Sequence, residues 1–299
     1  MSLLFDDETL VKKASYLRIA ARDLAEGLKS GSFRSLYRGQ GIEFAGVRDY
    51  IRGDDIRSID WNVTARMGRP YVKLFEEERE LQIFILLDTS LSMQTGSSKL
   101  KKLSKSAETA ALLTIAAELN SCPIGAIFFD GEIYFTSEPK SGRNQTLYVL
   151  SNLDKIEQNG TKGTVLANAI SGASRILRKR SLVFVISDFR AADWEKPIIT
   201  LAQKNDVVAL RLYEDSQNEI PLVGTAPFKD AESGISMMIP TTNPNFQKEW
   251  KKYHENLERR WYETCIKHGI YPAKMNTNDE PLSVLNGIFA NSTGKSQGR

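Results

Sequence analysis

Two short runs of apolar residues constrain the fold of this chain more than any other feature. Residues 81–87 are almost continuously apolar, and residues 182–186 are entirely so. A strand with one face in water alternates apolar and polar residues, whereas a parallel sheet is covered on both faces and its strands lack this alternation. The two runs therefore predict central strands of a parallel sheet with helices on both faces.

Strand and helix patterns alternate around these two runs. We expect further strands at 124–129, 133–135, 207–212, 236–239 and 273–275, and helices at 101–119, 147–156, 166–178, 198–204, 246–268 and from 279 onward. Such alternation is typical of an α/β fold with a doubly wound, mostly parallel sheet. In that fold the loops after the strands gather at one edge, where ligands normally bind.

The first 78 residues predict a separate module. Residues 7–28 carry apolar residues at the spacing of an amphipathic helix. Residues 35–69 are rich in glycine, arginine and aspartate, so we expect irregular structure with no long helix, followed by a strand at 71–75. The expected division is a module over 1–78, an α/β domain over 79–290 and a disordered tail over 291–299.

Within the module, the segment 53–61 allows two interpretations. In the first, Asp54, Arg57, Asp60 and Arg66 fix the segment through arginine–carboxylate pairs, and Trp61 packs beneath them. In the second, arginine and tryptophan form a docking surface for a partner, because both residue types are common interface anchors. The sequence favours the first interpretation.

Composition narrows the function classes. The chain has 299 residues and a net charge of +3, with basic and acidic residues mixed, so a nucleic-acid-binding stripe is not expected. The two cysteines suit a reducing compartment. With only two histidines besides, the chain has few candidate residues for zinc binding or for Ser-His or Cys-His catalysis. The start lacks a signal-peptide pattern, and no apolar run reaches the roughly 18 to 20 residues of a membrane span. We therefore expect a cytoplasmic protein.

Polar residues that suit a hard cation follow both buried runs. The first run leads into Asp88, Ser90 and Ser92, which offer one carboxylate and two hydroxyls. The second ends at Asp188, and Thr164 opens a predicted helix. The strand ends of a parallel sheet meet at one edge, and oxygen ligands of this kind suit Mg²⁺. Each residue alone also fits the alternative of a turn former or a helix cap.

The set formed by Asp88, Ser90, Ser92, Thr164 and Asp188 resembles the metal-ion-dependent adhesion site of von Willebrand factor A domains. The resemblance implies a von Willebrand factor A-like, Rossmann-like fold that holds one divalent cation, Mg²⁺ in preference to Mn²⁺ or Ca²⁺. It implies that the serines and the threonine bind the cation directly and that the aspartates often act through water. An acidic side chain of a protein partner then completes the coordination. Thr161 is an alternative to Thr164, but the Ala-Ile pair that follows at helical distance fits Thr164 better.

A second resemblance lies upstream of the first buried run. The segments GQGIEF at 39–44, RDY at 48–50, GDDIRSIDW at 53–61 and PYVK at 70–73 resemble the hallmark of the bacterial domain-of-unknown-function 58 family. Genes of that family often neighbour a MoxR-type AAA+ ATPase. The resemblance therefore implies an adaptor or chaperone-like partner of such an ATPase or of its client.

Two alternatives to a metal-dependent binding module are considered. A haloacid dehalogenase-like phosphatase also ends an apolar strand in an aspartate, but it needs a second carboxylate two residues later, where this chain has Ser90. The chain also lacks a P-loop, and Lys99 and Lys102 are interpreted as part of a solvated helix face. The last alternative is a structural scaffold that never holds metal. We expect a protein that is not an enzyme.

Overall fold

The computed structural model describes residues 38–78, 81–94, 101–156, 165–214, 224–229 and 236–291. The helix expected at 7–28, the candidate ligand Thr164 and residues 292–299 of the expected tail lie outside the described residues. Asn291 closes the last helix, so the tail does not begin at residue 291 as expected.

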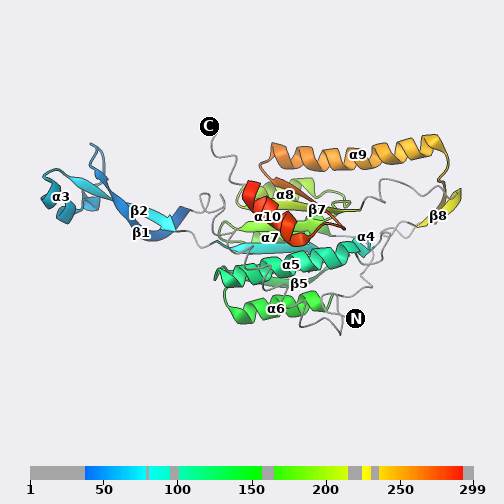
Figure 1. Ribbon diagram of the computed structural model, residues 1–299, viewed down its shortest axis with the longest axis horizontal. Helices are drawn as coiled ribbons and strands as arrows, with labels where there is room; N and C mark the ends of the chain where they lie inside the picture. Colours follow the sequence, from blue (N-terminus) through cyan, green and yellow to red (C-terminus); the bar gives the residue numbers. More distant parts are fainter. Residues whose placement is uncertain are drawn as a thin grey trace.

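A six-stranded sheet forms the centre of the molecule (Figure 1). Its spatial order is β10-β7-β6-β3-β4-β5, and every neighbouring pair is parallel except β4 and β5. The bounds are β3 (Ile83–Asp88), β4 (Ile124–Phe129), β5 (Ile133–Lys140), β6 (Leu182–Ser187), β7 (Asp206–Tyr213) and β10 (Tyr271–Asn276). The expected α/β fold with a mostly parallel sheet is confirmed.

Helices cover both faces of this sheet. They are α4 (Leu91–Gln94), α5 (Lys101–Leu119), α6 (Arg143–Asp154), α7 (Leu166–Ile176), α8 (Glu195–Ala202), α9 (Pro244–Lys267) and α10 (Pro281–Asn291). On β3, Ile83 and Ile85 pack into a core with residues of α5, α6 and α10. Phe84 and Leu86 point to the opposite face and pack into a second core with residues of α7, α8 and α9. This double burial explains why the strand sequence does not alternate.

The N-terminal module is more regular than the sequence predicts. Strand β1 (Arg38–Asp49) pairs antiparallel with β2 (Tyr71–Glu78), and the connection contains the 3-10 helix η1 (Ile56–Ser58) and the helix α3 (Trp61–Met67). Figure 1 shows this hairpin extending away from the six-stranded sheet, with α3 at its far end. The pairing shifts register between Arg38 and Ile42 and again between Phe44 and Gly46. These irregularities fall in the glycine-rich stretch, because glycine tolerates the backbone of a bulge.

The interpretation that Trp61 packs beneath the charged residues is wrong. Its side chain is 67% exposed at the start of α3. The partner of Asp54 is Arg48, whose guanidinium donates two hydrogen bonds of 2.7 Å to the carboxylate. Asp60 instead caps α3 by accepting the backbone N–H groups of Asn62 and Val63. Local capping and one forked ion pair therefore organise this connection, while the Trp61 side chain lies mostly in solvent.

A second hairpin, formed by β8 (Thr225–Lys229) and β9 (Ser236–Pro240), precedes α9. The sequence predicts β9 but not β8. The long helix α9 begins where Asn243 caps it and Pro244 occupies its first turn, and Gly269 follows its end with a φ of 70°. Among the described residues, none of the helices is both long enough and apolar enough to cross a bilayer.

Candidate metal centre

The two aspartates predicted to bind metal lie on neighbouring strands at one edge of the sheet. Asp88 is the last residue of β3, and Asp188 follows the last residue of β6. The parallel register aligns Leu87 with Ile186, which places Asp88 beside Ser187. The Ser187 hydroxyl donates a 2.6 Å hydrogen bond to Oδ2 of Asp88. The structure thus brings both strand ends together as the sequence predicts.

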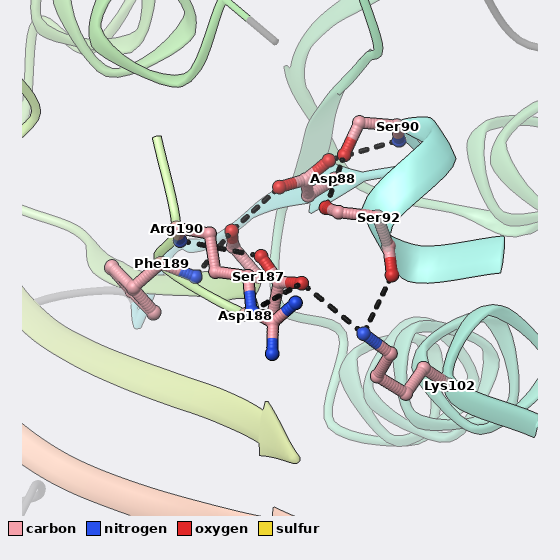
Figure 2. Close-up of polar contacts among 8 residues, drawn as sticks. All are labelled: Asp88, Ser90, Ser92, Lys102, Ser187, Asp188, Phe189 and Arg190. Carbon is pink, nitrogen blue, oxygen red and sulfur yellow. Dashed lines mark hydrogen bonds and ion pairs between the residues drawn. The ribbon is translucent and has the colours of Figure 1, made fainter. Parts of the chain in front are cut away.

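The turn after β3 aims two hydroxyls at each other (Figure 2). The backbone N–H of Ser90 donates to Oδ1 of Asp88 at 2.9 Å, which tightens the turn. The Oγ atoms of Ser90 and Ser92 are 3.1 Å apart, and both side chains are buried. Oxygens that occupy adjacent corners of an octahedron around Mg²⁺ lie about 3.0 Å apart. The spacing of the two hydroxyls therefore suits two neighbouring ligands of one cation.

Asp188 is held by cationic groups as well as by the backbone. Its Oδ1 accepts the backbone N–H of Arg190 at 3.3 Å, and its Oδ2 lies 3.2 Å from Nζ of Lys102. The guanidinium Nε of Arg190 is 3.8 Å from the same Oδ2. Only 3% of Asp188 is exposed. Two positive charges consequently offset this buried carboxylate.

The expectation that Lys102 lies on a solvated helix face is wrong. The residue is 2% exposed, and its ammonium donates to the backbone carbonyl of Ser92 at 2.6 Å and to Asp188 (Figure 2). The aliphatic stem packs inside while the charge is paired, which is how a lysine becomes fully buried. Lys99 lies outside the described residues.

Burial and the neighbouring charges shift the pKa values of the two aspartates in opposite directions. Burial, with a further contribution from the negative charge of Asp188, raises the pKa of Asp88 to about 7. Burial also acts to raise the pKa of Asp188, but the charges of Lys102 and Arg190 outweigh it and hold that pKa below its usual value. Burial lowers the pKa of Lys102, and Asp188 opposes this effect. A cation bound between the aspartates would favour the ionised form of both.

The chemistry of these side chains fits a hard divalent cation. Asp88, Asp188, Ser90 and Ser92 supply only oxygen atoms, the ligand type that Mg²⁺ prefers. Within the described residues, no cluster of three or more His, Cys, Asp or Glu side chains forms a metal-binding group.

The position of Thr164 is not described, but the next residue, Val165, donates its backbone N–H to the Asp130 carbonyl at 3.0 Å. Because Asp130 follows β4, the neighbour of β3, the chain approaches the same sheet edge at Val165.

Sequence reasoning missed three residues that shape this site, Ser187, Lys102 and Arg190. Ser187 precedes Asp188 at a strand end, which is the signal that could have indicated its role. Lys102 is followed at helical spacing by Ser106 and Thr109, and both are buried. A polar row on a helix ordinarily indicates a solvated face, so the local sequence carries no signal that Lys102 points inward.

Comparisons with known proteins identify a family and several relatives of this chain. The model of the family described as "Protein of unknown function DUF58" matches residues 46–260. Uncharacterized proteins of Mycobacterium tuberculosis (strain ATCC 25618 / H37Rv) and Mycobacterium bovis are each 30% identical to this chain over 233 residues, covering 77% of this chain and 73% of theirs.

A solved structure of an aerotolerance-related membrane protein from Bacteroides fragilis NCTC 9343, with multiple mutations to serines, is also similar. It is 19% identical, with a TM-score of 0.47, and the match covers 71% of this chain and 98% of that chain. The family match extends from the β1–β2 hairpin into α9 and so includes both strand ends of the candidate site. The chain therefore belongs to the DUF58 family, whose function is unknown.

Proposed function

We propose that this protein is a non-enzymatic binding module that uses one divalent cation, preferably Mg²⁺, to bind an acidic side chain of a partner protein. The observation that carries the proposal is the convergence of Asp88, Asp188 and the paired hydroxyls of Ser90 and Ser92 at one sheet edge. This arrangement agrees with the adhesion-site resemblance of the sequence. Thr164 remains the proposed fifth residue.

In this proposal each part of the site has a separate task. Ser90 and Ser92 would bind the cation through their hydroxyls, and the aspartates would supply its counter-charge. Ser187 keeps Asp88 oriented by donating to its Oδ2 atom. When bound, the cation supplies a coordination position that a carboxylate from outside the chain can fill. Both carboxylates of the described site already accept hydrogen bonds, Asp88 from Ser187 and Asp188 from Lys102, which favours capture over hydrolysis.

The proposed partner is a MoxR-type AAA+ ATPase or a client of that ATPase. The support for this choice is the membership of the chain in the DUF58 family, because genes of that family often neighbour such an ATPase. Recovery of the ATPase from the native host with the wild-type chain, and its loss on adding a chelator, is the expected result. Recovery that is independent of the chelator would contradict a metal-dependent contact.

The metal dependence is tested by thermal unfolding. Saturating Mg²⁺ or Mn²⁺, at about 100 times its dissociation constant, should stabilise the wild type by about 2.7 kcal/mol. Asp88→Ala should abolish the shift because it removes a carboxylate of the site. Asp206→Ala is the matched control, since Asp206 begins β7 at the opposite edge and pairs with Arg180. The control should keep the shift, and the absence of any shift in the wild type would favour a metal-free scaffold.

A phosphatase is the second candidate, and the buried Lys102 is the observation that favours it. An ammonium beside Asp188 could bind a phosphoryl group. Against this, Lys102 already donates to Ser92 and Asp188, and Ser90 stands where a general acid would be needed. Release of phosphate from a generic ester by the wild type, lost in Asp88→Ala, would establish the phosphatase instead.

A further inference from the structure

The candidate metal centre contains a positively charged side chain, Lys102. The ammonium of Lys102 donates to the Ser92 carbonyl at 2.6 Å and to Asp188 at 3.2 Å, so it lies between the two proposed metal-binding loops (Figure 2). We propose that Lys102 opposes the divalent cation at this site, so that metal binds tightly only together with the carboxylate of the partner. This inference rests on the proposed metal-dependent function and names the residue that regulates it.

The fold keeps the ammonium within reach of the site. Lys102 is 2% exposed and belongs to the first turn of α5. On one face of the next turns of that helix, Leu103, Ala107 and Ala110 are fully buried in the core. A lysine on a flexible surface segment could swing into water when a metal ion arrives. Here the buried helix limits that movement, so the lysine and the metal ion must share the carboxylate of Asp188.

The charges of the side chains at this site balance when both aspartates are ionised. When ionised, Asp88 and Asp188 contribute two negative charges, and Lys102 and Arg190 contribute two positive ones. A divalent cation would leave this buried cluster with a net positive charge, which is costly in a poorly solvated place. A carboxylate from a partner lowers that excess. The cation and the acidic partner therefore stabilise one another at the site, and each binds weakly without the other.

Removal of the lysine charge tests this coupling. We would measure Mn²⁺ binding to the full chain by electron paramagnetic resonance, with and without acetate as the carboxylate probe. Lys102→Gln keeps a donor for the Ser92 carbonyl but removes the charge, and it should tighten Mn²⁺ binding about tenfold because the repulsion is lost. Acetate should improve binding by the wild type more than binding by this variant. Lys105→Gln is the matched control on the same helix, since Lys105 pairs with Glu108 away from the site, and it should match the wild type.

A second variant keeps the test decisive if Lys102→Gln does not fold. Arg190 is partly exposed and contacts the same Asp188, so Arg190→Gln should tighten Mn²⁺ binding about threefold. Equal affinities in the wild type and in both variants would overturn the role of Lys102 and leave the metal-dependent function intact. No Mn²⁺ binding by any of these proteins, even with acetate, would overturn the proposed function together with this inference. The inference is supported if Lys102→Gln and Arg190→Gln bind Mn²⁺ more tightly than the wild type while Lys105→Gln does not.

Discussion

The α/β domain and the N-terminal hairpin differ in which side chains they bury and which they expose. In the domain, the charged side chains of the candidate site lie inside, and Asp88, Lys102 and Asp188 are nearly fully buried. In the hairpin, large apolar side chains lie outside, and Ile56 and Trp61 are 65% and 67% exposed. Buried charges persist only when other groups compensate them, and exposed apolar side chains contribute little to folding. The comparison indicates that the domain obtains its stability from its interior and the hairpin from backbone pairing and helix capping.

The two regions also differ in the reach of the contacts that hold them. Lys102 and Asp188 are 86 positions apart in the sequence, and Ser187 reaches Asp88 across 99. In the connection of the hairpin, Arg48 binds Asp54 six positions away, and Asp60 caps the helix that follows it directly. Substitutions in the domain should therefore have large effects that spread, while those in the connection should have small, local effects.

The largest expected effect is in the core of the domain. Phe84→Ala removes a fully buried ring from the centre of β3, and it should lower the free energy of unfolding by about 3 to 5 kcal/mol. Urea denaturation followed by circular dichroism measures this change. Leu147→Ala on the surface of α6 is the control, since that side chain is 53% exposed and its loss should change stability by less than about 0.5 kcal/mol. Similar effects of the two substitutions would mean that the domain interior is not the main source of stability.

We expect an effect of intermediate size on the pH dependence of the free energy of unfolding, and it should come from His254 in α9. Burial lowers the pKa of His254 to about 4, and the nearby charges of Arg190 and Arg211 act in the same direction. Because the folded pKa lies below the unfolded one, the unfolded chain binds a proton first as the pH falls below about 6.5. Stability from this residue is therefore present above pH 6.5 and is lost as the pH falls toward 4.

The variant His254→Gln should remove that part of the pH dependence. The difference in unfolding free energy between wild type and variant should change by about 1 to 2 kcal/mol between pH 6.5 and pH 4, with the wild type losing more. His268→Gln is the control, because His268 is exposed at the end of α9 and the substitution leaves His254 in place. A difference that does not vary with pH would show that His254 is protonated equally in both states.

The sequence predicts the interior of the domain well because a strand that is buried on both faces consists almost entirely of apolar residues. The apolar runs identify β3 and β6, and the helix expected at 101–119 matches α5. Asp88 and Asp188 could be placed together because adjacent parallel strands end at the same edge.

What the sequence does not predict depends on partners that are distant along the chain or on irregular backbone. Lys102 resembles a surface residue until Asp188 is placed beside it, since nothing in the local sequence shows the pairing. Strand β1 is missed because its glycines suggest loops, whereas its hydrogen bonds come from β2 with two register shifts. Trp61 is misplaced because the size of an aromatic ring suggests burial even where the helix that carries it has no core to cover.

The smallest expected effect tests the hairpin directly. Trp61→Ala removes a large side chain that is mostly in solvent, so the free energy of unfolding should change by less than about 0.5 kcal/mol. The same variant should lose much of the tryptophan fluorescence that acrylamide quenches, because Trp194 and Trp261 are nearly fully buried and Trp250 is only partly exposed. Trp261→Ala is the matched control and should cost about 3 to 5 kcal/mol. A loss of more than about 1 kcal/mol in Trp61→Ala would indicate that this ring packs as the sequence suggested. A near-neutral result would keep the docking interpretation of the segment 53–61 open to test, because the side chain would then serve no purpose in folding.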